Sequence, residues 1–224
     1  MLNRKASIAP TLLCADPLNL RQEISSLEKL DIKWHHVDMM DGHFVPNLAF
    51  GMDAVAAICR AAKMPVCVHL MADRPGDYVG RLADSGVSGF VFHIEAERAP
   101  FRLIGAVREA GMLCGAAISP ITPIEVLGPI LPHLQIVTVM GVEPGFSGQS
   151  FLPHTIGKIA ALRALADHQN PSLMIEVDGG VDDLNGPQCA ASGADVLVGG
   201  AFTLFKKGAS LEENFTRFSQ ALDR

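Results

Sequence analysis

The chain has 224 residues, of which 49% are hydrophobic and 6% aromatic, and 18 basic against 24 acidic side chains give a formal net charge of -6. This length and composition predict one α/β domain spanning residues 1–224 and disfavour an all-β sandwich. No basic cluster or long apolar run is present, and residues 1–5 begin without a signal-peptide pattern, so we expect a cytoplasmic protein that binds neither nucleic acid nor membrane.

Eight short apolar segments predict strands, and each is followed by a longer segment of helical periodicity. The strands are expected at 7–11, 34–39, 66–70, 90–93, 113–118, 136–140, 173–177 and 196–198, and the helices at 18–30, 52–62, 76–85, 101–110, 124–131, 155–167, 184–192 and 211–222. Gly86, Gly111 and Gly193 each follow a predicted helix, where a positive φ closes the last turn. Eight such pairs most simply form a single (β/α)8 TIM barrel, although an open doubly wound sheet fits the same alternation.

Two potential metal ligands lie near the end of the second predicted strand. His36 and Asp38 point to one face of this strand, whereas His35 and Val37 point to the other, because strand side chains alternate. Such a pair can bind a metal ion, but a buried histidine can also pair with a carboxylate when no metal is present. The pair alone leaves both interpretations open.

Two further polar residues end other predicted strands. His69 closes an apolar strand, and Asp178 precedes Gly179 and Gly180. Each has an ordinary explanation, a satisfied core histidine and a common Asp-Gly turn. In a barrel, however, the ends of strands two, three and seven open at the same mouth, so these residues can converge with His36 and Asp38. Two imidazoles and two carboxylates suit one Zn, Fe, Mn or Co ion rather than Mg or Ca.

Glycine-rich loops follow the last three predicted strands, at 143–149, 179–180 and 199–201. Glycine lets backbone N–H groups approach phosphate oxygens, and we expect the last loop to open a short helix at 202–205. Barrels often hold phosphate after strands seven and eight. The loops therefore predict a phosphate site without a basic residue, with three tight turns as the alternative.

These segments together resemble the ribulose-phosphate 3-epimerase family over essentially the whole chain. The stretches that carry the resemblance are IAPTLLCAD (8–16), HVDMMDGHFVPN (36–47), HLM (69–71), VMGVEPGFSGQ (139–149) and VDGG (177–180). The resemblance implies that His36, Asp38, His69 and Asp178 hold one divalent metal, that Asp38 and Asp178 are the acid–base pair, and that Met40, Met71 and Met140 cap the site. We expect a sugar phosphate to contact Thr11, His69, Gly145, Phe146, Ser147, Gly148, Gly179, Gly180, Gly200 and Ala201. Relatives of this kind commonly self-associate, which implies a homo-oligomer.

The implied reaction is epimerisation at C3 of a ketose phosphate, D-ribulose 5-phosphate to D-xylulose 5-phosphate, by two-base proton transfer through an enediolate. The chain departs from the family pattern at Gly141, where threonine is usual, at Ser147, where glycine is usual, and at Ala201, where serine is usual. These departures leave a hexulose phosphate such as allulose 6-phosphate as the alternative substrate. A related decarboxylase is disfavoured because residues 38–41 lack its lysine, and a binding protein without activity is disfavoured by the intact ligand set.

Overall fold

A computed structural model describes residues 6–223. Residues 1–5 and 224 of the predicted domain lie outside this described part, and so does the segment expected to lack a signal-peptide pattern. Nine strands form one sheet in the order β1-β9-β8-β7-β6-β5-β4-β2-β3. Neighbouring strands are parallel except β2 and β3. The strands are β1 (Ser7–Pro10), β2 (His35–Asp41), β3 (Leu48–Ala49), β4 (Val66–Met71), β5 (Gly89–His93), β6 (Leu113–Ile118), β7 (Ile136–Met140), β8 (Met174–Asp178) and β9 (Val196–Gly199).

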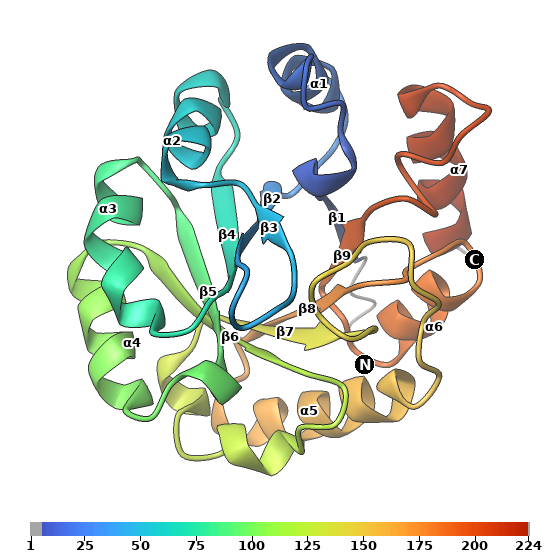
Figure 1. The fold of residues 1–224 in the computed structure, drawn as a ribbon. Coiled ribbons are helices and arrows are strands. Elements are labelled where there is room, and N and C mark those ends of the chain that lie inside the picture. Colours follow the sequence, from blue (N-terminus) through green and yellow to red (C-terminus); the bar gives the residue numbers. More distant parts are fainter. Residues whose placement is uncertain (1–5, 224) are drawn as a thin grey trace.

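The sheet is strongly curled, and its first strand lies close to β2 (Figure 1). Isolated parallel bridges pair Ile8 with Ile32 and Thr11 with His36. The backbone N–H of Lys33 also donates to the carbonyl of Ile8 over 2.8 Å. The carboxyl ends of β1, β2, β4 and β8 therefore face a common opening.

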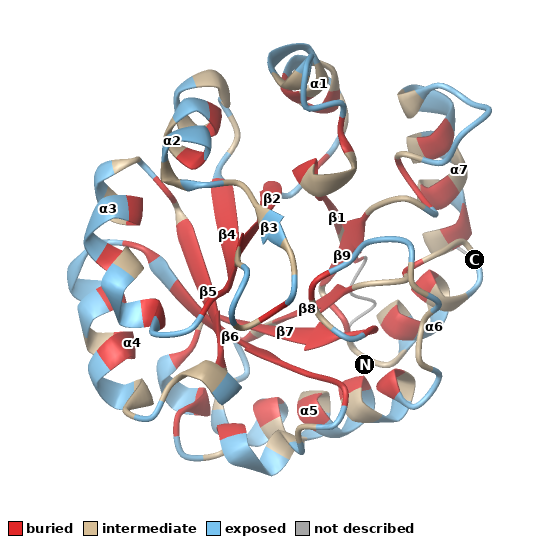
Figure 2. Ribbon diagram, viewed as in Figure 1, coloured by how far each residue is buried: buried red, intermediate tan, exposed pale blue. Residues whose placement is uncertain are grey.

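Helices cover the convex face of the sheet, with their apolar sides buried and their outer sides exposed (Figure 2). They are α1 (Leu20–Leu27), α2 (Met52–Ala61), α3 (Val79–Asp84), α4 (Pro100–Glu109), α5 (Thr155–Gln169), α6 (Asn185–Ala191) and α7 (Leu211–Leu222). Short 3-10 helices are η1 (Leu12–Cys14), η2 (Pro75–Tyr78), η3 (Ile94–Ala96), η4 (Ile124–Leu127) and η5 (Leu131–His133). Within residues 6–223, none of the helices has the length and apolarity to cross a membrane.

Two hydrophobic clusters lie on opposite faces of the sheet. The larger lies between the sheet and the helices and includes Phe90, Phe92 and Phe218. The smaller gathers one side chain from most strands on the concave face: Ala9, Trp34, Cys67, Val91, Ala117, Ile136 and Val196. This second cluster fills one end of the concave face. Polar side chains further along the same strands therefore pack against apolar side chains on one side.

Two predicted helices are wrong. Residues 124–131 form η4 and, from Leu131, the start of η5 instead of one α-helix. Pro129 and Pro132 lack the N–H that an α-helix needs and clash with its preceding turn, which explains the break. The short helix expected at 202–205 is a turn, in which the carbonyl of Gly200 accepts the N–H groups of both Thr203 and Phe205 over 3.1 Å.

Candidate active site

Four side chains from three strands converge on the concave face. His36 and Asp38 come from β2, His69 from β4 and Asp178 from β8, and their ligand atoms all lie within 4.8 Å of one another. The Nδ1 atom of His69 is 3.2 Å from Oδ1 of Asp38 and 3.3 Å from Oδ2 of Asp178. The Nε2 atom of His36 is 3.3 Å from Oδ1 of Asp38 and 3.8 Å from Oδ2 of Asp178. Two nitrogen and two oxygen donors facing one point fit a Zn, Fe, Mn or Co ion.

The same geometry sets the charges of the cluster. Burial opposes the imidazolium form of His36, but the carboxylates of Asp38 and Glu176 outweigh it and hold the pKa of His36 well above its usual value. For His69, burial is again outweighed by Asp178 and Asp38, which raise its pKa to about 9. Burial would raise the pKa of Asp38, yet the two histidines keep it below its usual range. Without a cation, protons on the imidazoles balance the carboxylates, so a metal ion binding here must displace them.

Glu176 supports the cluster from below and was missed in the sequence analysis. Its Oε1 atom lies 3.4 Å from Nδ1 of His36 and accepts the hydroxyl of Thr138 over 2.8 Å, while Oε2 accepts the indole N–H of Trp34 over 3.1 Å. Glu176 is fully buried. Its position two residues before Asp178 was the available signal, because the alternation that joins His36 to Asp38 also joins Glu176 to Asp178.

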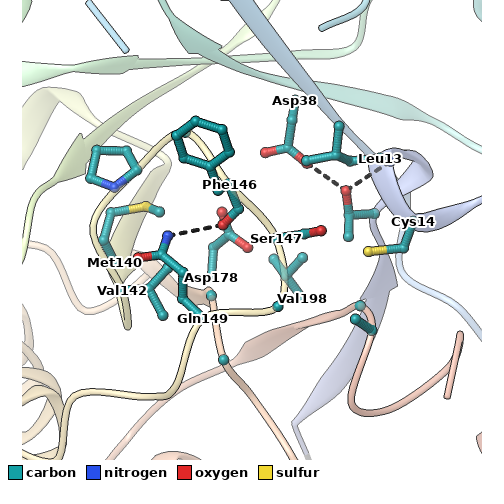
Figure 3. A pocket seen from close by; sticks show the side chains of 18 of the residues that line it. Leu13, Cys14, Asp38, Met140, Val142, Phe146, Ser147, Gln149, Asp178 and Val198 are labelled. Carbon is teal, nitrogen blue, oxygen red and sulfur yellow. Dashed lines mark hydrogen bonds between the residues drawn. The ribbon is translucent and has the colours of Figure 1, made fainter. Parts of the chain in front are cut away.

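Asp38 and Asp178 of this cluster line a pocket (Figure 3). Apart from His36 and His69, which are buried beneath it, every predicted site residue lines this pocket: Thr11, Asp38, Met40, Met71, Met140, Gly145, Phe146, Ser147, Gly148, Asp178, Gly179, Gly180, Gly200 and Ala201. The hydroxyl of Thr11 donates to Oδ2 of Asp38. Met40 and Met71 pack in a small apolar cluster with Val45, separate from the main core.

The glycine loops form the opposite wall of the pocket. Gly145 has a φ of 117°, and its carbonyl accepts the side-chain amide of Asn47 over 2.7 Å. The amide of Gln149 donates to the carbonyls of Glu143 (2.6 Å) and Phe146 (2.9 Å), which braces this loop internally. Among the described residues that line the pocket, none is lysine or arginine. Any anion bound here must therefore be held by backbone N–H groups, hydroxyls or a metal ion.

The three departures from the family pattern have separate settings. At Gly141 a Cβ would lie 2.3 Å from the carbonyl oxygen of Gly179, so no side chain fits without moving that turn. Ser147 and Ala201 line the pocket together with Cys14, and the side chain of Ser147 points toward that of Cys14 (Figure 3). Burial and the nearby charge of Asp38 raise the pKa of Cys14 to about 11, so the thiol stays protonated.

Two more polar residues adjoin His69 and were also missed. The Nε2 atom of His93, at the end of β5, is 2.9 Å from Nε2 of His69, and Nδ1 of His93 is 3.1 Å from Oε2 of Glu95. Burial lowers the pKa of His93 despite Glu95. Burial opposes ionisation of Glu95, but hydrogen bonds from His93, Thr122 and Ser119 lower its pKa to about 2. The signal in the sequence was a His-x-Glu pair at the end of the predicted strand 90–93.

Comparison with known proteins identifies the family of the chain. Residues 7–204 match the model of the Ribulose-phosphate 3 epimerase family. The chain belongs to this family. Its ribulose-phosphate 3-epimerase relatives include one from Treponema pallidum, 41% identical over 200 residues that cover 89% of this chain and 92% of the relative. Another, from Rhodobacter capsulatus, is 42% identical over 207 residues, covering 92% and 89%. Membership makes the chain an isomerase of the epimerase class and confirms the family predicted from the sequence.

More distant solved structures share only the fold. A variant of the tryptophan synthase α-subunit from Pyrococcus furiosus aligns with a TM-score of 0.69 at 15% identity, covering 98% of each chain. Tryptophan synthase from Mycobacterium tuberculosis aligns with a TM-score of 0.67, covering 99% of this chain and 93% of that chain, also at 15% identity. These similarities place the epimerase family member among TIM-barrel-like α/β folds and carry no information on its reaction.

Proposed function

We propose that this epimerase interconverts D-ribulose 5-phosphate and D-xylulose 5-phosphate by inverting C3. The observation that carries the proposal is the convergence of His36, Asp38, His69 and Asp178 beneath a pocket whose far wall consists of glycine loops. One end of this pocket offers a place for the reacting carbons, and the other offers backbone donors for a phosphate. The relatives named above carry the same activity in their names.

One divalent ion, held by His36, Asp38, His69 and Asp178, would supply Lewis-acid stabilisation of the negative charge that develops on the substrate oxygens. The donor set suits Zn, Fe, Mn or Co, and the buried charges support a cation in this position. Glu176, through His36, orients one ligand from beneath.

Asp38 and Asp178 perform the proton transfers in this proposal. Inverting a carbon next to a ketone requires a base on one face and an acid on the other, and the two aspartates come from β2 and β8, on different sides of the cluster. The low pKa of Asp38 keeps it ionised, so it has a carboxylate oxygen able to accept the C3 proton. Asp178 then returns a proton to the opposite face of the enediolate, and the roles reverse in the other direction.

The phosphate would bind between the loops at 145–148, 179–180 and 200–201. Gly179 and Gly180 have φ values of 98° and 68°, which turn the backbone sharply after β8, and both residues line the pocket, where their N–H groups would be available to a phosphate. The hydroxyl of Ser147 would add a side-chain donor. Met40, Met71 and Met140 would exclude water from the reacting carbons.

We further propose that residues 1–224 form a single catalytic domain whose curled sheet is a closed (β/α)8 barrel. The bridges between the β1 and β2 segments support closure. We also propose a cytoplasmic location, in keeping with a rice relative named as a cytoplasmic isoform. The partners of the present chain would be a small sugar phosphate and further copies of the same chain. The partly exposed side chain of Phe202 is available for self-association.

The deciding experiment is proton NMR in D2O with metal-loaded protein, offered ribulose 5-phosphate and allulose 6-phosphate separately. We expect exchange at C3 and appearance of xylulose 5-phosphate, both abolished by a chelator. Turnover of allulose 6-phosphate alone would assign a hexulose substrate, and exchange of neither would reject the proposal.

The two-base scheme has its own variants in the same assay. Asp38→Asn and Asp178→Asn should each lower turnover by a factor of about 10³ or more while leaving the circular dichroism spectrum unchanged, because either loss removes one of the two proton carriers. Turnover within about tenfold of the native rate in either variant would reject the two-base scheme. It would not contradict the proposed metal site.

A further inference from the structure

A buried line of hydrogen-bonding groups runs outward from the ligand cluster through His69, His93 and Glu95. His69 and His93 are fully buried, and their rings stack with centroids 5.0 Å apart. Neither His93 nor Glu95 lines the pocket, so neither contacts substrate, and His93 is outside the four-residue ligand set. The proposed chemistry uses neither residue.

The outer end of this line is an acceptor with a fixed orientation. Oε1 of Glu95 accepts the N–H of Ser119 over 2.8 Å and the hydroxyl of Thr122. The other oxygen, Oε2, faces Nδ1 of His93 at 3.1 Å. Because a carboxylate only accepts hydrogen bonds, Nδ1 of His93 must carry the proton.

The remaining protons follow from this assignment. A neutral imidazole donates from one nitrogen and accepts at the other, so Nε2 of His93 is an acceptor. The Nε2 atom of His69, 2.9 Å away, must therefore donate. Once a metal ion displaces the second proton of His69, the lone pair is left on Nδ1, the atom that lies 3.2 Å from Asp38 and 3.3 Å from Asp178. The opposite arrangement would place a hydrogen on Nδ1 and block it as a ligand.

We propose that His93 and Glu95 are positioning residues that hold His69 in the tautomer able to bind the divalent metal. The inference rests on the metal site of the proposed function and adds to it two residues that touch neither metal nor substrate. Outer partners of this kind typically change metal affinity by about 10- to 100-fold.

The substitution Glu95→Gln separates this role from simple structural support. The side-chain oxygen of the glutamine would still accept the N–H of Ser119 and the hydroxyl of Thr122. The NH2 group would then take the place of Oε2 and face Nδ1 of His93. His93 would then accept at Nδ1, donate from Nε2 and force the hydrogen of His69 onto Nδ1. Glu95→Gln reverses the proton order, whereas Glu95→Ala only leaves it unspecified.

The chain also offers a matched control. Glu28 pairs with the buried His35 over 3.3 Å, and like Glu95 it accepts a backbone N–H, that of Met64 over 2.9 Å. His35 points away from the ligand cluster, because it alternates with His36 along β2. Glu28→Gln therefore removes the charge from a second His–Glu pair that has no connection to the metal.

The test measures Zn²⁺ and Co²⁺ affinity without substrate, by competition with a chromogenic chelator at one fixed pH, together with thermal unfolding of the metal-free variants. We expect Glu95→Gln to weaken binding by about 10- to 100-fold, Glu95→Ala to weaken it less, and Glu28→Gln to leave it within about twofold. In the zinc-loaded native protein, ¹⁵N NMR should find the proton of His93 on Nδ1.

Purely structural support would give the reverse order, because alanine leaves Ser119 and Thr122 without their acceptor and glutamine does not. Equal affinity of Glu95→Gln and the native protein, or a weaker Glu95→Ala than Glu95→Gln, would overturn the proposal and leave the proposed function intact. If the native protein binds neither metal, the proposed metal site itself fails and the positioning role fails with it.

Discussion

The carboxylate of Asp38 is shared between two kinds of partner. Oδ1 faces the imidazoles of His36 and His69, and Oδ2 accepts the hydroxyl of Thr11. In the proposed mechanism, a metal ion at Oδ1 and a substrate proton at Oδ2 therefore need not compete for one oxygen of Asp38. Thr11 also belongs to the segment that follows β1, so its hydroxyl joins Asp38 on β2 to a neighbouring strand.

Ser147 allows the proposed phosphate end of the pocket to be tested. Ser147→Ala removes one neutral donor, worth about 0.5–1.5 kcal/mol, so we expect KM for ribulose 5-phosphate to rise about 3- to 10-fold with kcat nearly unchanged. Steady-state kinetics check this, with Ser150→Ala as the control, since Ser150 lies outside this pocket. A fall in kcat at constant KM would instead connect the hydroxyl with the proton transfers.

The sequence predicts most of the site because its residues end strands, where direction and alternation are regular. It predicts less well the groups whose role depends on contacts between strands. His93 and Glu95 matter only because β5 lies beside β4, and no periodicity reports that Nε2 of His93 meets Nε2 of His69. The sequence shows Gly141 only as a departure from threonine, whereas the structure shows that the carbonyl of Gly179 leaves no room for a side chain there.

At the scale of elements, the predicted strands agree with the structure to within about one or two residues, and local turn chemistry accounts for most of the differences. Pro129 and Pro132 break the helix expected at 124–131, and β3 (Leu48–Ala49) escapes detection because two residues show no alternation. Its antiparallel pairing with Met40 and Asp41 folds the loop after β2 back across the mouth. Long-range pairing of this kind has no local signal.

Glu28 connects three elements and predicts a pH dependence of stability. It lies at the C-terminus of α1, accepts the N–H groups of Lys63 and Met64 before β4, and faces His35 on β2. Burial opposes ionisation, but the hydrogen bonds of Met64 and Lys63 outweigh it, and the folded pKa lies below 4.5. Its stabilising effect is therefore complete above pH 4.5 and is lost as the pH falls through the folded pKa.

We expect Glu28→Gln to lower the free energy of unfolding by about 1–2 kcal/mol at pH 7. The difference from the native protein should shrink as the pH falls below about 4.5, because the native carboxylate then becomes protonated. Urea denaturation of the metal-free proteins between pH 7 and pH 3 measures both effects. A difference that stays constant over this range would show that the charge of Glu28 contributes nothing.

For the whole molecule, the ligand cluster connects distant parts of one sheet. β2 and β4 are paired neighbours, whereas β8 is separated from β4 by β5, β6 and β7, so a metal held by all three strands would tie opposite sides of the curled sheet together. A ligand at 100 times its Kd stabilises the folded state by about 2.7 kcal/mol. For a chain of this size, this corresponds to a rise in Tm of about 5–10 °C.

Differential scanning fluorimetry with and without Zn²⁺ or Co²⁺ tests this expectation. Asp178→Asn and His69→Ala should lose most of the metal-dependent rise, because each removes a ligand. A rise of equal size in these variants would mean that the metal stabilises the protein from another site.

The absence of lysine and arginine from the described pocket lining also affects how substrate arrives. Neutral backbone donors act only at short range, and the chain carries a formal net charge of -6, so its overall field repels a phosphate dianion rather than guiding it. Added salt screens that repulsion, so kcat/KM should stay level or rise between about 10 and 200 mM ionic strength, where an enzyme with a lysine-lined entrance would slow down. Stopped-flow assays at graded salt would show this, and a steep decline would reveal attraction from a source outside the pocket. Salt therefore does not slow the capture of substrate at this pocket, and a solution of high ionic strength costs the enzyme nothing at the encounter step.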